Sequence, residues 1–256
     1  MIHPTAIVSP KAELDSDIEI GPYSIVGDKV KIGKNTRIGP HVVLEGQAEI
    51  GQNCQIFPFA SIGSIPQDLK FKGEESQVII GSGNIIREYV TINRGTAPGG
   101  GKTVLGDGNF LMVYSHVAHD CKIGNQVIIA NAAQLAGHIE IEDHAIIGGI
   151  VGVHQFVRIG RYSIIGACSA VSRDVPPYTM AAGNHAVLHG LNTVGLKRHN
   201  FSEEAIGNIK KAYQIIFRSG LLLKTALEKA ESEIPGSPEV MNMIIFIRES
   251  ERGVIR

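Results

Sequence analysis

Aliphatic residues recur at every sixth position along most of the chain. The series spans residues 2–62, resumes in the same phase over 80–92, and continues after a one-residue phase change over 105–171. It comprises 26 aliphatic positions. A period of six matches neither the 3.6-residue period of a helix nor the simple alternation of a strand. The pattern indicates very short strands that alternate with turns.

The other positions of each hexad are biased as well. Glycine often follows the aliphatic residue, as at Gly21, Gly33 and Gly51, and a small residue often stands four positions after it, as at Ala48 and Cys54. Hexapeptide repeats are typical of parallel β-helices, in which stacked coils share one continuous core. The sequence therefore predicts a mainly β protein with a narrow aliphatic interior.

Two segments interrupt the hexads. Residues 64–79 and 95–103 are rich in proline, glycine and charged residues, and we expect both to be loops that leave the wall of the β-helix. Loops on a rigid scaffold often carry function, although an insertion can equally be a tolerated one.

The hexads stop after Pro176-Pro177. Beyond them, apolar residues at helical spacing predict helices over about 203–218, 221–233 and 239–252, with Ser202 as a cap of the first. The predicted organisation is a β-helix domain over residues 1–190, including the two loops, and a small α-helical domain over 191–256.

Composition narrows the function classes. The chain has 256 residues, 43% hydrophobic and 19% charged, with a formal net charge of −1, which argues against disorder and against a general nucleic-acid binder. No apolar run reaches the ~18 residues of a transmembrane helix. The absence of tryptophan fits an interior too narrow for large rings. Three separated cysteines, with no signal peptide recognised, favour a reducing, cytoplasmic setting.

The repeat resembles that of the hexapeptide-repeat transferases. The resemblance implies a left-handed parallel β-helix of triangular section, in which three hexads make one 18-residue coil, although parallel crossovers are usually right-handed. Residues three hexads apart then stack in adjacent coils. Histidines gather at one corner of this stack, together with an aspartate, a glycine and a glutamine, namely His116, His119, Asp120, Gly137, His138, His154 and Gln155.

This corner has residues that could act as a general base and stabilise a developing negative charge. A histidine such as His119 can act as a base near neutral pH, and the adjacent Asp120 could orient its ring. The backbone N–H of Gly137, one coil away, could face a developing oxyanion. The sequence therefore predicts a catalytic site centred on His119.

Longer motifs resemble the UDP-N-acetylglucosamine O-acyltransferase family along the whole chain. They are His116-Val-Ala-His119-Asp120, Leu135-Ala-Gly-His138, Val153-His154-Gln155-Phe156, Gln67-Asp68-Leu69-Lys70, Arg87-Glu88-Tyr89-Val90-Thr91-Ile92, Arg94-Gly95-Thr96, Asp174-Val-Pro-Pro-Tyr178, Gly183-Asn184-His185-Ala186, Asn192 and Gly195-Leu196-Lys197-Arg198. Two positions depart from the family pattern: Asn93, where histidine is more common, and His199, where a second arginine is common.

The resemblance implies transfer of a 3-hydroxyacyl group from acyl carrier protein to the glucosamine 3-hydroxyl of UDP-N-acetylglucosamine, the first step of lipid A biosynthesis. It implies His119 as the base, Asp120 as its partner and Gly137 as the oxyanion donor. Substrate-binding residues implied in the same way are Asp68, Lys70, His116, His138, His154, Gln155, Asn192 and Arg198. Ala167 would form the floor under the acyl chain, and its small side chain predicts a fairly long chain.

The resemblance also implies a homotrimer whose active sites lie between subunits, with no metal and no dissociable cofactor. Other interpretations stay open at this point. One is a different hexapeptide acyltransferase that uses acetyl-CoA or acylates an amine. A γ-class carbonic anhydrase would need a zinc-binding histidine pair five residues apart, which is lacking. A β-helix scaffold without catalysis is the third.

Overall fold

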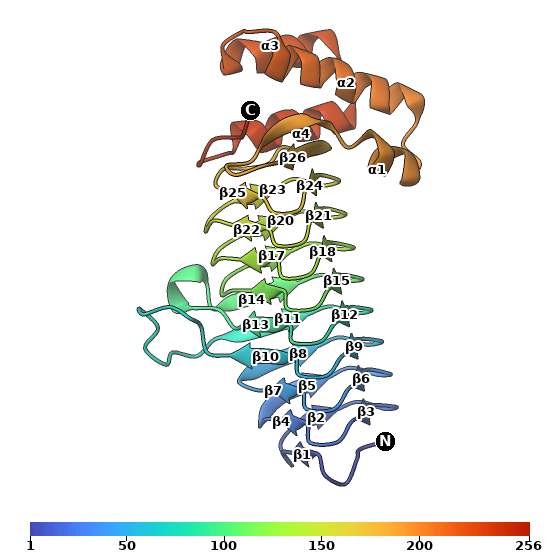
Figure 1. Cartoon of the computed structure of the whole chain (residues 1–256), viewed down its shortest axis with the longest axis vertical. Coiled ribbons are helices and arrows are strands. Elements are labelled where there is room, and N and C mark those ends of the chain that lie inside the picture. Colours follow the sequence, from blue (N-terminus) through green and yellow to red (C-terminus); the bar gives the residue numbers. More distant parts are fainter.

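The computed structural model describes residues 1–256, and three parallel sheets form the walls of a long prism (Figure 1). The first face contains β1 (Ile7–Val8), β4 (Ile25–Val26), β7 (Val43–Leu44), β10 (Ser61–Ser64), β13 (Thr91–Asn93), β16 (His116–Val117), β19 (Gln134–Leu135), β22 (Gly152–Val153) and β25 (Ala170–Val171). The second face contains β2 (Glu13–Leu14), β5 (Lys29–Ile32), β8 (Gln47–Ile50), β11 (Gln77–Ile80), β14 (Lys102–Leu105), β17 (Lys122–Ile123), β20 (Glu140–Ile141) and β23 (Arg158–Ile159).

The third face is the longest. It contains β3 (Glu19–Ile20), β6 (Arg37–Ile38), β9 (Gln55–Ile56), β12 (Ile85–Ile86), β15 (Phe110–Leu111), β18 (Ile128–Ile129), β21 (Ile146–Ile147), β24 (Ile164–Ile165), β26 (Thr179–Ala182) and β27 (Val187–Leu191). All neighbouring strands in the prism are parallel except β26 and β27, which form an antiparallel hairpin at its C-terminal end.

The register of the strands confirms the parallel β-helix. Ile7 pairs with Ile25 and Val8 with Val26, so one coil consists of three hexads. The aliphatic residue of each hexad points inward, and from Ile20 onward every one of them is buried. Burying one such side chain contributes about 1.5–3 kcal/mol relative to leaving it exposed, and the hexads repeat this contribution along the whole prism.

The three corners of the prism are tight turns. We call the turns from the first face to the second the first corner, those from the second to the third the second corner, and those from the third back to the first the third corner. A non-glycine residue with positive φ stands in most of these turns, such as Asp120 and His138, both at φ 60°. This backbone region costs an L-residue about 1–2 kcal/mol. Hydrogen bonds between coils, such as His138 N–H to the His119 carbonyl at 3.0 Å, help to offset the cost.

Both interruptions of the hexads leave the prism at the first corner (Figure 1). Ser61 pairs with Thr91, and Gln77 pairs with Lys102, so in both pairs the partners are further apart along the chain than one regular coil. The first insertion joins β10 to β11, and the second, which contains the short 3-10 helix Ala97–Gly99, joins β13 to β14. The next turn of this corner carries His119 and Asp120, so the two insertions occupy the two turns before the predicted site.

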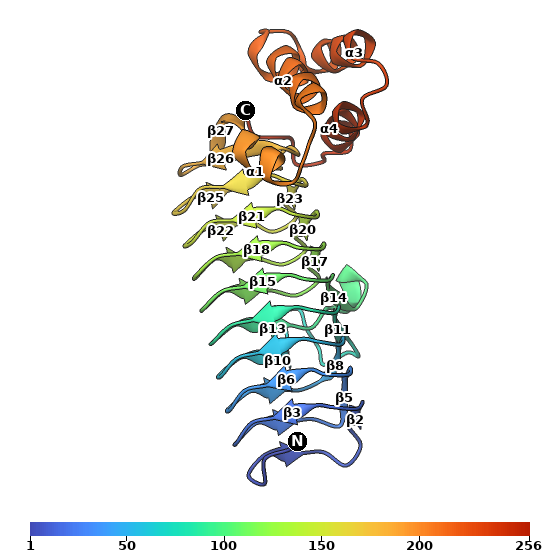
Figure 2. The ribbon, with the colours of Figure 1, turned by 90° about the vertical axis from the view of Figure 1, so that its right-hand side faces the viewer.

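Four helices cover the C-terminal end of the prism (Figure 2). They are α1 (Thr193–Arg198), α2 (Glu203–Arg218), α3 (Leu223–Glu233) and α4 (Pro238–Arg248). The predicted helix over 203–218 has the bounds of α2, and Ser202 caps it by accepting the Ala205 N–H. The sequence did not predict α1, and α4 ends four residues earlier than expected.

The chain after α4 turns back to the prism. Val254 bridges to Asp174, whose side chain accepts the Ser250 hydroxyl at 2.6 Å, and Ile255 belongs to the core of the prism. The helical region and the β-helix are therefore joined by the last residues as well as by the connection after β27. None of the helices is both long and apolar enough to span a membrane.

Candidate active site

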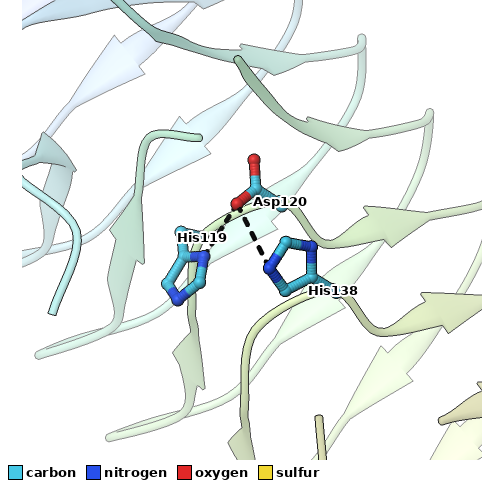
Figure 3. A group of neighbouring side chains, drawn as sticks. All are labelled: His119, Asp120 and His138. Atoms are coloured by element: carbon cyan, nitrogen blue, oxygen red, sulfur yellow. Dashed lines mark hydrogen bonds and ion pairs between the residues drawn. The ribbon is translucent and has the colours of Figure 1, made fainter. Parts of the chain in front are cut away.

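His119 and Asp120 form a hydrogen-bonded pair in the first corner (Figure 3). His119 Nδ1 lies 2.8 Å from Asp120 Oδ2, and the side chains are 13% and 1% exposed. The left-handed turn at Asp120 directs its carboxylate back toward the preceding ring. Since a carboxylate accepts the Nδ1 proton, the Nε2 lone pair of His119 is free to take another proton.

His138 stands one coil above Asp120 in the same corner. Its Nε2 lies 3.7 Å from Asp120 Oδ2, its ring meets that of His119 edge-on, and its other face stacks on Phe156 at 4.5 Å between centroids. Burial lowers the pKa of His138 below its ordinary value, although the charge of Asp120 opposes that shift. The neutral imidazole is thereby favoured, which suits a hydrogen-bonding role.

Gly137 lies directly against the His119 ring. A Cβ at this position would stand 2.6 Å from His119 Cε1 and 2.8 Å from Nε2, so any side chain would displace the ring. The Gly137 N–H donates no hydrogen bond to another backbone carbonyl. This position therefore combines close packing on the His119 ring with an available N–H donor.

A groove of about 600 Å³ runs along the first face beside this corner. Its walls include His116, His119, Gly137, His154 and Gln155, which brings these predicted residues together. Gln67 enters from the first insertion, and Gly152 and Ala170 line the part of the first face toward its C-terminal end.

His116 is held by a neighbour on the coil below. Its Nδ1 lies 2.7 Å from the Thr91 hydroxyl. Burial lowers the pKa of His116, and the nearby His119 lowers it further. Both effects favour the neutral form of His116.

Asp68 and Lys70 belong to the first insertion. The Asp68 carboxylate accepts the Lys70 N–H at 2.9 Å, and its charge raises the proton affinity of His138, which places Asp68 near the site. The Lys70 side chain is exposed. Asn93, one of the two departures, donates to the Ile65 carbonyl at 3.0 Å and so anchors the start of this insertion.

Asn192 and Arg198 lie near the second corner, away from the groove. Asn192 is the N-cap of α1, accepting the Gly195 N–H, and it donates to the Tyr162 carbonyl in the second corner at 2.9 Å. Arg198 ends α1, and the adjacent His199 contacts the Tyr162 ring at the same corner. Within one chain, these two residues and His119 therefore stand at different corners of the prism.

Ala167 occupies the third corner, where it is exposed. It follows β24, at the opposite edge of the first face from His119. The small residues Gly152 and Ala170 stand on the outer surface of that face. The face between the two corners is therefore nearly free of bulky side chains at this level.

One arrangement in the site is compatible with a cation. The ligand atoms of His119, Asp120 and His138 lie within 4.8 Å of one another. Both oxygens of Asp120 already accept hydrogen bonds from Thr96, however, through its N–H and its hydroxyl. A metal would have to compete with these donors, and the expectation that none takes part stays a prediction.

Sequence reasoning assigned no role to several residues of the site. Thr96 and Gly99 contact Asp120 from the second insertion, and Gln67, Gly152 and His185 line the groove. The insertion itself was the available signal, since it interrupts the hexads one turn before His119. Its contacts could not be placed, because the stacking of residues one coil apart does not extend to residues outside the coils.

Comparisons with known proteins cover the whole chain. A family model described as "Udp N-acetylglucosamine O-acyltransferase; Domain 2" matches residues 174–255, and one described as "Bacterial transferase hexapeptide (six repeats)" matches 11–46 and 102–137. An acyl-[acyl-carrier-protein]–UDP-N-acetylglucosamine O-acyltransferase of Thermodesulfovibrio yellowstonii is 58% identical over 255 residues, covering 100% of this chain and 99% of the relative. The enzyme of the same name from Alkalilimnicola ehrlichii is 57% identical, with the same coverage.

Solved structures agree with these relatives. LpxA from Acinetobacter baumannii superimposes with a TM-score of 0.96 at 46% identity, covering 100% of this chain and 99% of that one. UDP-N-acetylglucosamine acyltransferase from Arabidopsis superimposes with a TM-score of 0.89 at 36% identity and covers 100% of both chains.

Proposed function

The chain belongs to the UDP-N-acetylglucosamine O-acyltransferase family, and from this premise we propose how its residues perform the reaction. The protein is an acyltransferase that uses acyl carrier protein as donor and UDP-N-acetylglucosamine as acceptor. We propose that the group transferred is a 3-hydroxyacyl chain, that the acceptor atom is the glucosamine 3-hydroxyl, and that this is the first step of lipid A biosynthesis.

His119 is the proposed general base. Its Nε2 takes the proton of the sugar hydroxyl while the oxygen attacks the thioester carbonyl, so that a C–O bond forms. The Gly137 N–H stabilises the oxyanion of the tetrahedral intermediate. The C–S bond then breaks, and the proton on Nε2 passes to the departing thiolate. The observation that carries this proposal is the pair of contacts at His119, with Asp120 on Nδ1 and Gly137 against the ring.

We assign the remaining residues to different parts of the substrates according to where they lie. His116, His154 and Gln155 line its wall, and we assign them to the sugar, the diphosphate and the acyl carbonyl. His138 and Asp68, which interact electrostatically, contribute from the corner and the first insertion. Lys70 is exposed and is assigned to an anionic part of the substrate.

A second copy of the chain completes the proposed site. Asn192 and Arg198 are expected to bind the nucleotide, yet they stand near the second corner, whereas His119 stands at the first. A neighbouring prism can bring its second corner to this groove. The exposed rings of the third corner, where Tyr23 is 59% and Tyr114 57% exposed, offer apolar surface for assembly. We therefore propose a homotrimer with its sites between subunits.

The first face supports an extended path for the acyl chain. Gly152 and Ala170 leave its surface low between the catalytic corner and Ala167. The alanine at 167 leaves room where a longer side chain would end the path. We propose that Ala167 sets the limit of chain length and that this limit is a fairly long one.

The test of the proposed function is a mass-spectrometric assay with UDP-N-acetylglucosamine and carrier-bound 3-hydroxyacyl donors of graded length. His119→Ala should lower kcat by at least about 100-fold, the low end for loss of a general base. His3→Ala, which removes an exposed histidine far from the groove, is the matched control and should keep wild-type turnover. Near-normal turnover in a folded His119→Ala protein would exclude His119 as the base. Turnover with acetyl-CoA in place of the carrier-bound donor would favour the alternative acyltransferase.

A further inference from the structure

The Asp120 carboxylate receives three hydrogen bonds, two of them from one residue. Oδ1 accepts the Thr96 N–H at 2.8 Å, and Oδ2 accepts the Thr96 hydroxyl at 2.6 Å and His119 Nδ1–H at 2.8 Å. Thr96 is itself buried. It follows β13, which pairs with the β16 strand that leads to His119, so the second insertion brings Thr96 onto the carboxylate from the preceding coil.

This pair of bonds fixes the rotation of the carboxylate. Without it, Asp120 could turn about its side-chain bonds, and a second imidazole is close at hand, since His138 Nε2 lies 3.7 Å from the same Oδ2. Thr96 holds Oδ1 from the backbone and Oδ2 from the hydroxyl. The plane of the carboxylate is therefore set for the bond to His119, and charge-assisted bonds of this length are among the stronger ones in proteins.

Gly99 closes the insertion over the same carboxylate. A Cβ at Gly99 would overlap the carboxyl atoms of Asp120. The Gly99 N–H donates to the Thr96 carbonyl at 3.1 Å, so the turn that carries Gly99 is joined to the residue that binds Asp120. The carboxylate is thus covered by backbone where solvent would otherwise reach it, and its side chain is 1% exposed.

We propose that Thr96 is a positioning residue for acyl transfer, one that acts through Asp120 by holding the carboxylate toward His119, with Gly99 providing the space that this contact needs. The inference rests on the proposed roles of His119 and Asp120. It also assigns a role to the second insertion. The insertion lies outside the coils and supplies the two donors to Asp120, the Thr96 N–H and hydroxyl, which no hexad position offers.

The first test compares Thr96→Val with Thr96→Ser in the carrier-bound donor assay. Valine keeps the shape and the N–H but loses the hydroxyl, and we expect kcat to fall by on the order of 10-fold with KM for both substrates unchanged. Serine restores the hydroxyl and should bring kcat back to within about two-fold of wild type. The matched control is Thr36→Val, which removes another buried hydroxyl bonded to backbone at a distant coil and should leave kcat unchanged.

A double-mutant cycle shows whether Thr96 acts through Asp120. In an Asp120→Ala background, Thr96→Val should produce no further loss of kcat. A further loss as large as in the wild-type background would overturn the inference, and so would a wild-type kcat in the single Thr96→Val variant. If Asp120→Ala alone leaves kcat unchanged, the failure belongs to the proposed function and not to Thr96.

A second variant covers the case in which Thr96→Val does not fold. Gly99→Ala keeps both Thr96 groups but forces the carboxylate aside, and it should lower kcat by a similar factor without a change in KM. Its control is Gly207→Ala in α2, where an added Cβ meets no neighbour within 4 Å. A folded Gly99→Ala protein with wild-type kcat would contradict the proposed positioning of Asp120.

Discussion

At the scale of single residues, burial favours the neutral form of two histidines near His119. The pKa of His116 is lowered first by burial and then by His119, and the pKa of His138 is lowered mainly by burial. Both rings are therefore neutral at pH 7 and act as donors or acceptors without repelling the proton that His119 is proposed to take.

The lowered pKa of His116 predicts a pH dependence of stability. The unfolded chain takes up a proton on this residue near the ordinary pKa of 6.5, whereas the folded chain resists it. The contribution of neutral, buried His116 to the free energy of unfolding is therefore fully present above about pH 6.5. It is lost as the pH falls from there toward the pKa of His116 in the folded chain. His116→Gln removes this proton uptake, so its Tm should fall less than that of the wild type between pH 7 and pH 5.

The measurement is thermal unfolding of the substrate-free protein at a series of pH values. His3→Gln is the matched control, because its ring is exposed in the folded and unfolded chain alike, and it should follow the wild-type curve. If His116→Gln follows the wild-type curve as well, burial of His116 does not contribute to the acid sensitivity.

At the scale of elements, the hexad predicted almost every strand, because each strand of the coils is very short and one aliphatic residue points inward in each. The helix α1 was missed for the opposite reason. Its six residues contain a glycine and a single buried side chain, Leu196, so no helical periodicity can develop. It forms because Asn192 caps it and packing holds it against the prism.

The prediction about acyl-chain length concerns the third corner, where Ala167 lies. Asn131, Gly149 and Ala167 follow one another there at intervals of one coil, so a change in side-chain size at one of them alters a single level of the first face. Ala167→Met adds bulk at the proposed end of the acyl path. We expect the preferred donor to become shorter, while Gly207→Ala leaves the length profile unchanged. Identical profiles for wild type and Ala167→Met in the graded-donor assay would reject the assignment.

At the scale of the whole molecule, the sequence predicted that His119 and its neighbours cluster at the first corner. It did not predict which residues of the insertions contact that cluster. The 18-residue column places His119, Gly137 and Gln155 together without any structure. The columns are lost inside the insertions, which is why Thr96 and Gly99 were not assigned to the site. The return of Val254 and Ile255 to the prism was equally invisible, because it depends on long-range contacts with Asp174 and the core.

The proposed assembly predicts complementation between two inactive variants. His119→Ala and Arg198→Ala subunits each lack one half of a site, but a mixed trimer contains some sites with both residues intact. At equal mixing, about a quarter of the sites pair an intact His119 with an intact Arg198 from a neighbour, since a heterologous interface joins different surfaces of successive subunits. Co-expressed variants should therefore recover about that fraction of wild-type activity.

Separately purified variants, each kept as an unmixed assembly, are the control and should stay inactive when combined without exchange of subunits. Light scattering on the same samples reports the oligomeric state. Full activity in a monomer, or an absence of recovery in verified mixed assemblies, would contradict a site shared between copies.

The 18-residue register also constrains how such a gene can change in length. A gain or loss of one whole coil keeps every inward residue inward and every column in line, so the protein becomes taller or shorter by about 4.8 Å. A gain of one or two hexads would keep the aliphatic residues inward but move every later column to another face. A length that is not a multiple of six would turn the aliphatic residues out of the core, unless the extra residues leave the wall at a corner. The two insertions, which lie between Ser61 and Thr91 and between Gln77 and Lys102, leave the wall in this way. In this fold, an insertion that does not match the length of a coil extends outward at a corner, where its residues can add functional groups to a site such as that of His119.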